Sequence, residues 1–324
     1  MRRSLAVAAL CALALSGVAA AGNGGIAPVD PQSPNAEGIN DSYLWVSIFT
    51  GAIFLLVQGA LILFIVRYRR RRRPRAEDGA QIHGNTNLEL AWTVVPVLIL
   101  VAIGSFVFYK LPGIQDVPRA DASGGRLDVE VRGYRFYWQF TYPNGAIAID
   151  HMRAPADRNV RLRITAPDTD VIHSWWVPAL GGKFDAIPGR VNETWFNARN
   201  PGTYRGQCAE LCGDLHAKMT AEVEALPREE FDTWLEDEGR AQEAGTSNLG
   251  EEIFTGVCEK CHGLEGRGDI GPALRGNPLA ADARNVENVV RNGRRLMPAV
   301  GPDWTDRQMR ALTDYLEEEV AGGS

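Results

Sequence analysis

Four metal-binding side chains lie within twelve residues, in the segment Cys208-Ala-Glu-Leu-Cys-Gly-Asp-Leu-His-Ala-Lys-Met219. Thiolate, imidazole and thioether groups are soft or borderline ligands, which select copper over magnesium or calcium. The alternative is a disulfide between Cys208 and Cys212, which is common outside the cytosol. A disulfide would not call for His216 and Met219 directly behind it. The segment therefore favours a metal site.

An upstream histidine extends this candidate site. His173 lies within the string Asp170-Val-Ile-His-Ser-Trp-Trp-Val-Pro178. A lone histidine is commonly a hydrogen-bonded loop residue, but a copper sandwich takes one histidine from an early loop and its other ligands from a late one. A mononuclear blue-copper site needs only one thiolate, with two imidazoles and a weak axial thioether. The second thiolate fits two coppers bridged by two cysteines, with one histidine on each and Met219 as a weak ligand.

A second motif, Cys258-Glu-Lys-Cys-His262, is the attachment signature of haem c. The thiols of Cys258 and Cys261 add to the haem vinyl groups, and His262 becomes an axial ligand of the iron. A zinc knuckle is the alternative, but no further cysteine or histidine follows. We expect Met297 to be the sixth ligand, because Met309 lies in a predicted helix and suits packing. A thioether ligand raises the haem potential, as an acceptor of external electrons requires.

Two kinds of sequence pattern predict the elements that hold these motifs. Between residues 126 and 224, apolar residues alternate with polar ones and glycine or proline turns recur, which predicts a β-sandwich. After it, apolar residues recur with helical spacing and predict a small all-α domain. The expected helices are Leu249–Val257, Val286–Asn292 and Asp306–Glu319, and the loop beside the haem begins at Gly271-Pro272.

Two long apolar stretches predict membrane spans. Leu44–Val66 has Gln58 as its only strongly polar side chain, and a second stretch runs from about Trp92 to Tyr109 through Pro96. At about 1.5 Å per residue, a helix of this length crosses a hydrocarbon core of about 30 Å. We expect the two spans to form an antiparallel helical hairpin.

Charge predicts the orientation of this hairpin. Arg67, residues 69–73 and Arg75 are arginines that follow the first span, and the positive-inside rule places them in the cytoplasm. A nucleic-acid patch is the alternative, but the net charge of −6 argues against one. Residues 1–21 have the layout of an export signal, which would remove Cys11, although an uncleaved anchor is possible on the same pattern. Both termini are expected outside.

Together these segments resemble subunit II of bacterial haem–copper cytochrome c oxidases with a fused C-terminal cytochrome c, the caa type. The matching strings are Glu89-Leu-Ala-Trp-Thr-Val-Val-Pro96, Gly133-Tyr-Arg-Phe-Tyr-Trp-Gln-Phe-Thr-Tyr142, Asp170 to Pro178, Lys183-Phe-Asp-Ala-Ile-Pro-Gly-Arg190 and the cysteine segment. The resemblance implies a multidomain protein of the bacterial plasma membrane, with a two-helix transmembrane hairpin, an all-β cupredoxin sandwich and an all-α cytochrome c domain. The expected parts are a signal peptide at 1–21, the N-terminal segment and hairpin at 22–112, the cupredoxin domain at 113–226, a linker at 227–246 and the cytochrome c domain at 247–324.

The resemblance also implies roles for individual residues. Glu210 ligates one copper through its backbone carbonyl, and its carboxylate faces a magnesium ion at the boundary with subunit I. For Glu89, the residues alone favour a solvated acid at a helix start, whereas the resemblance implies the mouth of a proton channel. The full set of ligands that the resemblance implies for the binuclear copper centre, CuA, is His173, Cys208, Glu210, Cys212, His216 and Met219.

One position departs from the family pattern. The family's aromatic string usually opens with a tryptophan that receives electrons from soluble cytochrome c, and here the matching residue is Phe136, followed by Tyr137 and Trp138. The fused haem is therefore expected to replace direct docking at the copper domain. Electrons would pass from soluble cytochrome c, or an equivalent donor, through haem c to CuA.

The histidines limit what the chain does alone. None of the five lies inside a predicted span, and the oxygen-reducing centre of this family is held by imidazoles buried in the membrane. The chain is therefore expected to supply electrons to subunit I, with subunit III and membrane lipid as further partners, for reduction of O₂ to water coupled to proton pumping. The alternative is an electron-transfer module of a nitric or nitrous oxide reductase; a copper carrier would not explain the haem, and quinol oxidase subunits lack the copper ligands.

Overall fold

The computed structural model describes residues 28–68, 81, 83–119 and 125–321. It divides into a helical unit, Glu37–Ile114, and a second unit that holds the rest of the described chain. The predicted signal peptide, with Cys11, and the arginines at 69–73 and 75 lie outside the described residues.

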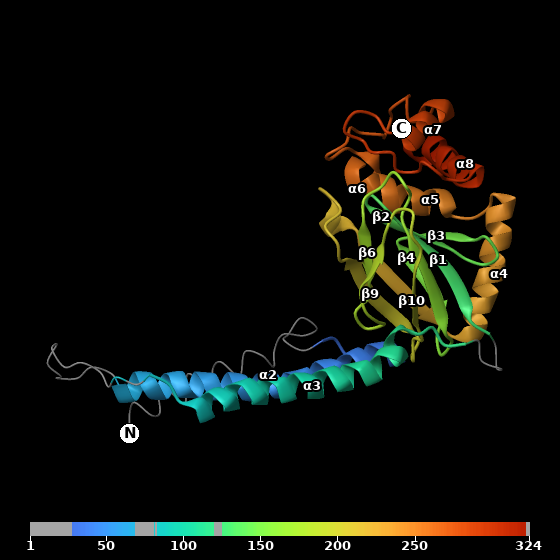
Figure 1. Cartoon of the computed structure of the whole chain (residues 1–324). Coiled ribbons are helices and arrows are strands. Elements are labelled where there is room, and N and C mark those ends of the chain that lie inside the picture. The colour runs from blue at the N-terminus through green and yellow to red at the C-terminus, as the bar shows by residue number, and fades with distance from the viewer. Residues whose placement is uncertain (1–27, 69–80, 82, 120–124, 322–324) are drawn as a thin grey trace, which may run out of the picture. The chain divides into compact units, whose positions relative to one another are not determined.

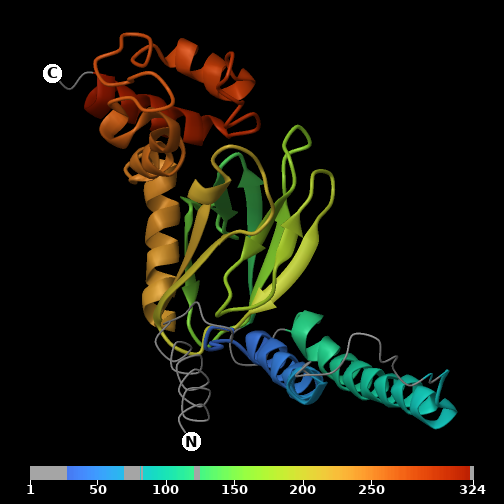
Figure 2. The same ribbon diagram turned by 90° about the vertical axis from the view of Figure 1, so that its left-hand side faces the viewer.

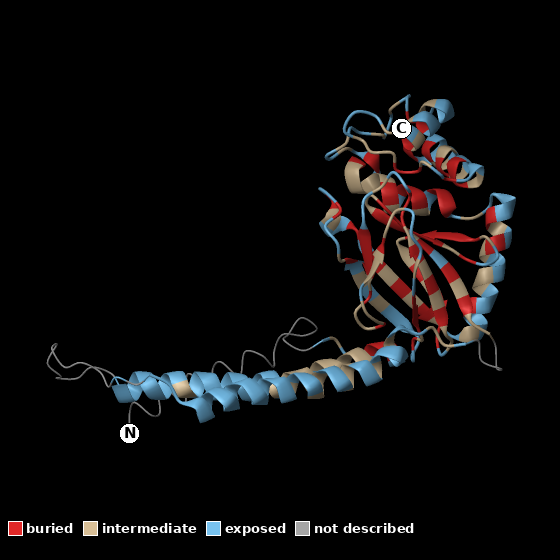
Figure 3. Ribbon diagram, in the orientation of Figure 1, coloured by how far each residue is buried: buried red, intermediate tan, exposed pale blue. Residues whose placement is uncertain are grey.

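The helical unit is built from two long helices, α2 (Pro34–Tyr68) and α3 (Thr86–Gln115). The rings of Trp45 and Phe106 stack with centroids 5.0 Å apart, and Lys110 Nζ lies 2.7 Å from Asp41 Oδ2. These contacts join the early part of one helix to the late part of the other, so the pair is antiparallel. Both helices are long and apolar enough to cross a membrane, and most of their apolar side chains are exposed (Figure 3). Each extends beyond the span expected from hydropathy.

The sandwich consists of two five-stranded sheets (Figure 1). One has the order β3-β2-β1-β5-β8 and the other β4-β10-β9-β6-β7; β1 with β5 and β4 with β10 are parallel, and the other neighbours are antiparallel. The strands are β1 (Leu127–Tyr134), β2 (Tyr137–Thr141), β3 (Ile147–Ile149), β4 (His151–Pro155), β5 (Val160–Thr165), β6 (His173–Trp176), β7 (Phe184–Ala186), β8 (Asn192–Phe196), β9 (Gly202–Cys208) and β10 (Thr220–Leu226).

The predicted alternation of apolar residues forms the interior of this sandwich. In β5, Val160, Leu162 and Ile164 are fully buried while the residues between them are half-buried. Successive side chains of a strand point to opposite faces, so this pattern directs one face of the sheet inward. The same core contains Cys208, Cys212 and Met219. The candidate copper ligands therefore lie at a well-packed end of the sandwich.

The segment predicted as a linker is largely a helix, α4 (Arg228–Ala244), which runs beside the sandwich (Figure 2). Phe231 is fully buried in the sandwich core, and Trp234 and Leu235 pack against it. Their spacing of three and four residues places them on one face of the helix. Gln242 accepts a hydrogen bond from Ile147 N at 3.0 Å and donates one to Ile147 O at 2.7 Å, so the helix also pairs with strand β3.

The C-terminal domain is helical, as expected. Asp282 caps α7, and Thr305 with Gln308 forms a capping box at the start of α8. Met309 is buried in the core of this domain, which confirms its packing role. The elements are α5 (Leu249–Ile253), the π-helical turn η2 (Phe254–Cys258), α6 (Glu259–His262), the short turn η3 (Leu264–Gly266), α7 (Ala283–Asn292), α8 (Asp306–Tyr315) and the π-helical turn η4 (Leu316–Ala321).

Candidate copper and haem sites

The candidate copper ligands come from two neighbouring strands and the loop that follows one of them. His173 begins β6, and Cys208 ends β9, which pairs with β6. The loop after β9 contains the short helical turn η1 (His216–Lys218). Cys208 N donates a hydrogen bond to Met219 O at 2.9 Å, which closes the loop. Ligands that are eleven residues apart in sequence are thereby brought together.

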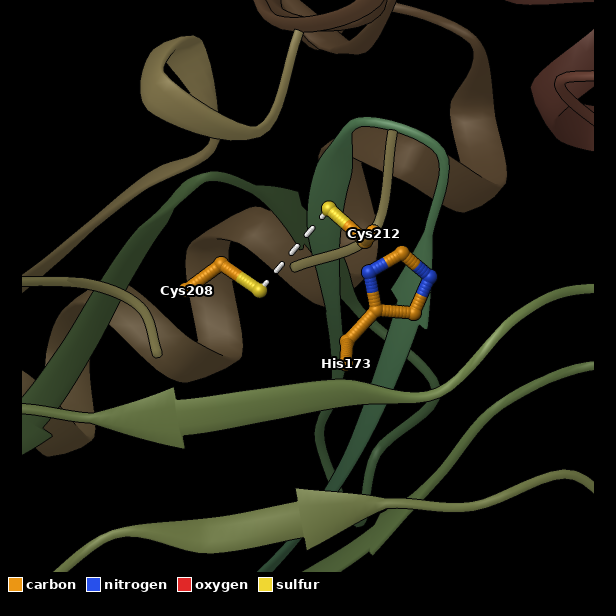
Figure 4. A group of neighbouring side chains, drawn as sticks. All are labelled: His173, Cys208 and Cys212. Carbon is orange, nitrogen blue, oxygen red and sulfur yellow. Dashed lines mark hydrogen bonds between the residues drawn. The ribbon is translucent and has the colours of Figure 1, made fainter. Parts of the chain in front are cut away.

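The side chains of this loop converge. The Sγ atoms of Cys208 and Cys212 are 4.0 Å apart, and neither cysteine forms a disulfide. Cys212 Sγ lies 3.6 Å from His216 Nδ1 and 3.9 Å from Met219 Sδ. A ligand atom of His173 lies within 4.8 Å of both sulfurs (Figure 4). Because metal–nitrogen and metal–sulfur bonds measure about 2.0–2.3 Å, separations of this size suit ligands that share an ion.

His173 gives a direct indication that this cluster holds a metal. The residue is completely buried, and both ring nitrogens lack a hydrogen-bond partner. A buried polar atom without a partner costs about 1–3 kcal/mol, so it requires an explanation. The nearest acid, Asp170, lies 3.5 Å away through Oδ1. A metal ion bound by the imidazole would remove this cost.

The two thiols also call for a cation. Their mutual hydrogen bond lowers the pKa of Cys208 to about 3 and raises that of Cys212, to which burial adds. One thiolate is therefore stable in this pocket, whereas a second would lie 4.0 Å from the first. Like charges this close disfavour double ionisation unless a cation lies between them. The donor set, two thiols with imidazole and thioether, is suited to copper.

Glu210 presents two different groups. Its backbone carbonyl accepts a hydrogen bond from Cys208 Sγ at 3.3 Å, so it faces the cluster as expected of a ligand. Its exposed carboxylate pairs with Lys183 Nζ at 3.1 Å, and the same amine lies 3.3 Å from Asp185. This ion pair could not be predicted, because Lys183 and Glu210 are far apart in the chain. No three-residue metal cluster includes Glu210 among the described residues.

The haem-attachment motif forms a compact helical turn. Cys258 ends η2, and Cys261 and His262 lie in α6. His262 is buried, and its Nδ1 lies 2.7 Å from Pro272 O. Because a carbonyl only accepts hydrogen bonds, Nδ1 carries the proton, and the lone pair on Nε2 is available to iron. Burial raises the pKa of Cys258 to about 12 and raises that of Cys261, so both thiols are neutral.

Two glycines shape the loops around this histidine. A Cβ on Gly271 would lie 2.8 Å from His262 Nδ1, so the predicted haem-side loop approaches the ring closely only because this residue has no side chain. Gly293 has a φ of 72°, and a Cβ there would lie 2.7 Å from Met297 O. The second glycine lets the loop that carries Met297 fold back after α7. Met297 is partly buried against the domain core.

The aromatic string divides between the two sites. The ring of Trp138 is T-shaped to that of His173, with centroids 6.1 Å apart. A Cβ on Gly213 would lie 3.1 Å from the ring of Phe136, so this ring lies against the copper loop. Tyr137 points to the helical domain, where its hydroxyl donates to Val300 O at 2.6 Å. The string thus contacts both the candidate copper site and the helical domain.

Glu89 lies at the start of α3 and caps it. Asn85 N donates to Glu89 Oε1 at 3.3 Å, and Leu88 N donates to Asn85 Oδ1 at 3.1 Å. These bonds satisfy amides at the helix start that have no partner within the helix. The position at the start of the second span matches the sequence prediction.

Comparisons with known proteins identify the family of this chain. Residues 23–109 match the model of the cytochrome c oxidase subunit II transmembrane domain, and residues 146–226 match its periplasmic domain. The cytochrome c oxidase subunit 2 of Alkalihalophilus pseudofirmus is 35% identical over 321 residues, which cover 91% of both chains. The chain belongs to the cytochrome c oxidase subunit II family. Subunit 2 from Cereibacter sphaeroides is 34% identical over 63% of this chain and 77% of its own.

The C-terminal part of this subunit II is a cytochrome c domain. Residues 246–316 match the model of the cbb3-type cytochrome c oxidase subunit III.

Among solved structures, the periplasmic domain of subunit II of the Bradyrhizobium japonicum cytochrome oxidase is 35% identical to this chain, with a TM-score of 0.35. The match covers 38% of this chain and 97% of that domain.

The chain is thus a membrane subunit of a haem–copper oxidase with two spans, a copper-binding cupredoxin domain and a haem-binding domain. It receives electrons on behalf of the complex and works with subunit I. Membership of this family disfavours the nitric or nitrous oxide reductase alternative.

Proposed function

We propose that this subunit takes electrons from a c-type cytochrome at its own haem and passes them through CuA to subunit I, where O₂ is reduced to water with proton pumping. The observation that supports this order is the contact between the two motifs. Lys218, which lies between the copper-loop residues His216 and Met219, donates from Nζ to the carbonyl of Lys260, which lies between the haem cysteines, at 3.3 Å. Neighbouring sites favour transfer within the chain.

The proposal assigns specific residues to each site. Cys258 and Cys261 would hold haem c covalently, and His262 Nε2 and Met297 Sδ would bind its iron. Haem supplies a one-electron iron couple, and the protein sets its potential through the thioether and the hydrogen bond from His262 Nδ1. The binuclear copper centre is assigned to His173, Cys208, Glu210 O, Cys212, His216 and Met219. Two coppers held there by the two thiolates would share one electron.

Phe136, Tyr137 and Trp138 are proposed as the path between these sites. Trp138 contacts the imidazole of His173, and Phe136 contacts the copper loop at Gly213. The carbonyl of Phe136 accepts a hydrogen bond from Lys260 Nζ at 2.9 Å. Side chains and hydrogen bonds thus connect the haem motif to a copper ligand without a gap.

Two further assignments concern the partner subunits. We assign Glu210 to a magnesium site at the boundary with subunit I; Lys183 would have to move away from the carboxylate for magnesium to bind there. Glu89 is assigned to the mouth of a proton channel shared with subunit I, and subunit III completes the complex. The orientation places both termini on the periplasmic side and the loop between the spans in the cytoplasm. The domain bounds remain those proposed above, with 227–246 as a mainly helical connector.

A haemless variant tests the order of electron transfer. In the assembled oxidase, Cys258→Ala with Cys261→Ala removes the haem attachment but leaves the copper ligands unchanged. Stopped-flow mixing with reduced soluble cytochrome c should then show slow or no reduction of copper, whereas the wild type reduces haem before copper. Copper reduction at the wild-type rate in the variant would contradict the relay.

Spectroscopy tests the nature of the two centres. Electron paramagnetic resonance of the oxidised complex should show one unpaired electron shared by two coppers, and visible spectroscopy after denaturation should show haem that stays bound to the chain. A signal from a single blue copper would exclude the binuclear assignment. Haem that is extracted by acidic solvent would exclude covalent attachment.

A further inference from the structure

The helical domain and the sandwich share a hydrophobic core. Tyr134, Tyr137, Ile147 and Ile149 of the sandwich are buried in one cluster with residues of the helical domain. A Cβ on Gly256 would lie 2.6 Å from Ile149 Cγ2, so the two domains approach each other without space between them. Domains joined only by a tether keep polar, solvated facing surfaces. The partners of these four residues in the cluster include Leu249, Ile253, Phe254, Val257, Val300 and Trp304.

Buried hydrogen bonds accompany this core. Trp304 Nε1 donates to the hydroxyl of Tyr137 at 2.8 Å, and that hydroxyl donates to Val300 O. Gln308 Nε2 donates to Gln139 Oε1 at 2.9 Å, and both glutamines are buried. Buried polar groups are stable only when they are paired, so each of these bonds depends on the docked arrangement.

A lysine of the haem motif completes the junction. The Lys260 amine donates to Phe136 O at 2.9 Å and forms an ion pair with Asp150. The side chains of Lys260 and Asp150 are only 13% and 18% exposed. The other carboxylate oxygen of Asp150 accepts the backbone N–H of Trp138 at 2.8 Å. Lys260 is thus linked through one acid to the residue whose ring contacts the copper ligand His173.

A second lysine approaches from the opposite side. Lys218 of the copper loop donates to Lys260 O at 3.3 Å and lies 3.6 Å from Asp269 Oδ2 in the haem-side loop. Its side chain is 50% exposed, so this contact contributes less than the buried pair of Lys260. The copper loop therefore directs a lysine to the haem motif, and the haem motif directs one to Phe136 and Asp150 of the sandwich. Lys218 and Lys260 thus both lie at the contact between the copper loop and the haem motif.

We infer that Lys260, assisted by Lys218, locks the haem domain onto the copper domain, so that electrons cross a fixed junction and the haem domain does not move as a tethered carrier. This inference rests on the proposed relay. Lys260 is a positioning residue, because it acts through Phe136 and Asp150 and not on the reacting ions.

The test compares Lys260→Met with wild type in the assembled oxidase. After photoreduction of the haem, electron transfer to copper in the wild type should be independent of solvent viscosity. In Lys260→Met it should become slower and decrease as viscosity rises. Lys260→Arg keeps the charge and the donors and should restore most of the rate. Arg267→Gln removes an exposed cation that pairs with Glu265, within the haem domain, and serves as the matched control.

Hydrogen exchange supplies a second measurement that does not depend on electron transfer. The amides of β2 should lose protection by about tenfold or more in Lys260→Met, because the unpaired acid opens the junction. Lys218→Met should give a smaller loss and keeps the haem motif intact. Unchanged protection in both variants, or a wild-type rate that falls with viscosity, would overturn the lock. Failure of the relay itself is distinct, since it would appear as copper reduction at the wild-type rate in the haemless variant.

Discussion

At the residue scale, the copper and haem assignments depend on short-range spacing, which is why the ligands could be predicted. Ligands in one loop, such as Cys208 and Cys212, are brought together by a single turn of the chain. The structure adds what spacing does not encode, namely the unpartnered nitrogens of buried His173 and the proton on His262 Nδ1. The partners of Glu210 and Lys260 could not be predicted, because they come from distant segments brought together only by folding.

The two C-terminal methionines should respond differently to substitution. Met297→Leu removes a thioether from a partly buried loop position, whereas Met309→Leu changes a buried core residue at nearly constant volume. We expect Met297→Leu to abolish the thioether-to-iron charge-transfer band and to lower the haem potential. Met309→Leu should keep both and change stability by less than about 1.5 kcal/mol. Loss of the band in Met309→Leu instead would reverse the assignment of the axial ligand.

Copper should stabilise the folded chain by binding the residues assigned to the copper site. An ion that binds only the native state stabilises it by about 4 kcal/mol when free copper exceeds the dissociation constant about a thousandfold. Removing copper with a chelator should therefore lower the melting temperature of the full chain, and adding copper back should restore it. Cys212→Ser should abolish this response. A response that survives in Cys212→Ser would mean that copper stabilises the chain elsewhere.

At the element scale, the strands and most helices follow the pattern of the sequence, whereas α4 differs from its predicted role. The segment 228–246 is rich in glutamate and alanine and has glycines at 239 and 245, a composition that favours a linker. The apolar contacts of α4 with the sandwich come from Phe231, Trp234 and Leu235, which lie on one face. An apolar face this short is a weak sequence signal for helix packing, because the sandwich surface that it covers is formed only in the folded chain. The hydrogen bonds between Gln242 and Ile147 depend on tertiary structure in the same way.

Truncation of Phe231 tests whether α4 is part of the fold. Phe231→Ala removes a completely buried ring and should lower the free energy of unfolding by about 3–5 kcal/mol. Thr233→Ala alters an exposed position on the same helix and should change it by less than about 0.5 kcal/mol. Denaturant unfolding of the full chain compares the two. Equal effects would mean that α4 does not stabilise the sandwich.

At the scale of the whole molecule, the sandwich and the haem domain form one unit with a cavity of about 430 Å³ at their boundary. Glu252 of α5 lines this cavity and is half-buried. Burial raises its pKa to about 7, and the charge of Glu238 adds to this effect, while Arg153 and His151 oppose it. An acid that titrates at the junction makes the stability of the docked unit depend on pH. Other residues that line the cavity are Ile147, Asp150, Trp234 and Thr255.

The sign of this dependence follows from the two pKa values of Glu252. Its pKa is about 7 in the folded chain and 4.5 in the unfolded one, so between these values the folded state holds a proton that the unfolded state has lost. The contribution of Glu252 to stability is therefore greatest below pH 4.5, falls as the pH rises towards 7 and is constant above it. The loss is about 2 kcal/mol, allowing for partial exposure of the group.

Glu252→Gln should remove this loss. The variant keeps the shape of the side chain without the charge, so its melting temperature should exceed that of the wild type at pH 8 and match it at pH 4.5. Glu251→Gln, at the exposed neighbouring position, is the control. It should leave the difference in melting temperature between the two pH values the same as in the wild type. Calorimetry of the full chain at both pH values measures the difference. Because Glu252 lies at the boundary, its protonation should also increase the hydrogen-exchange protection of β3. A melting difference between Glu252→Gln and wild type that is the same at both pH values would show that the acid does not titrate at the junction.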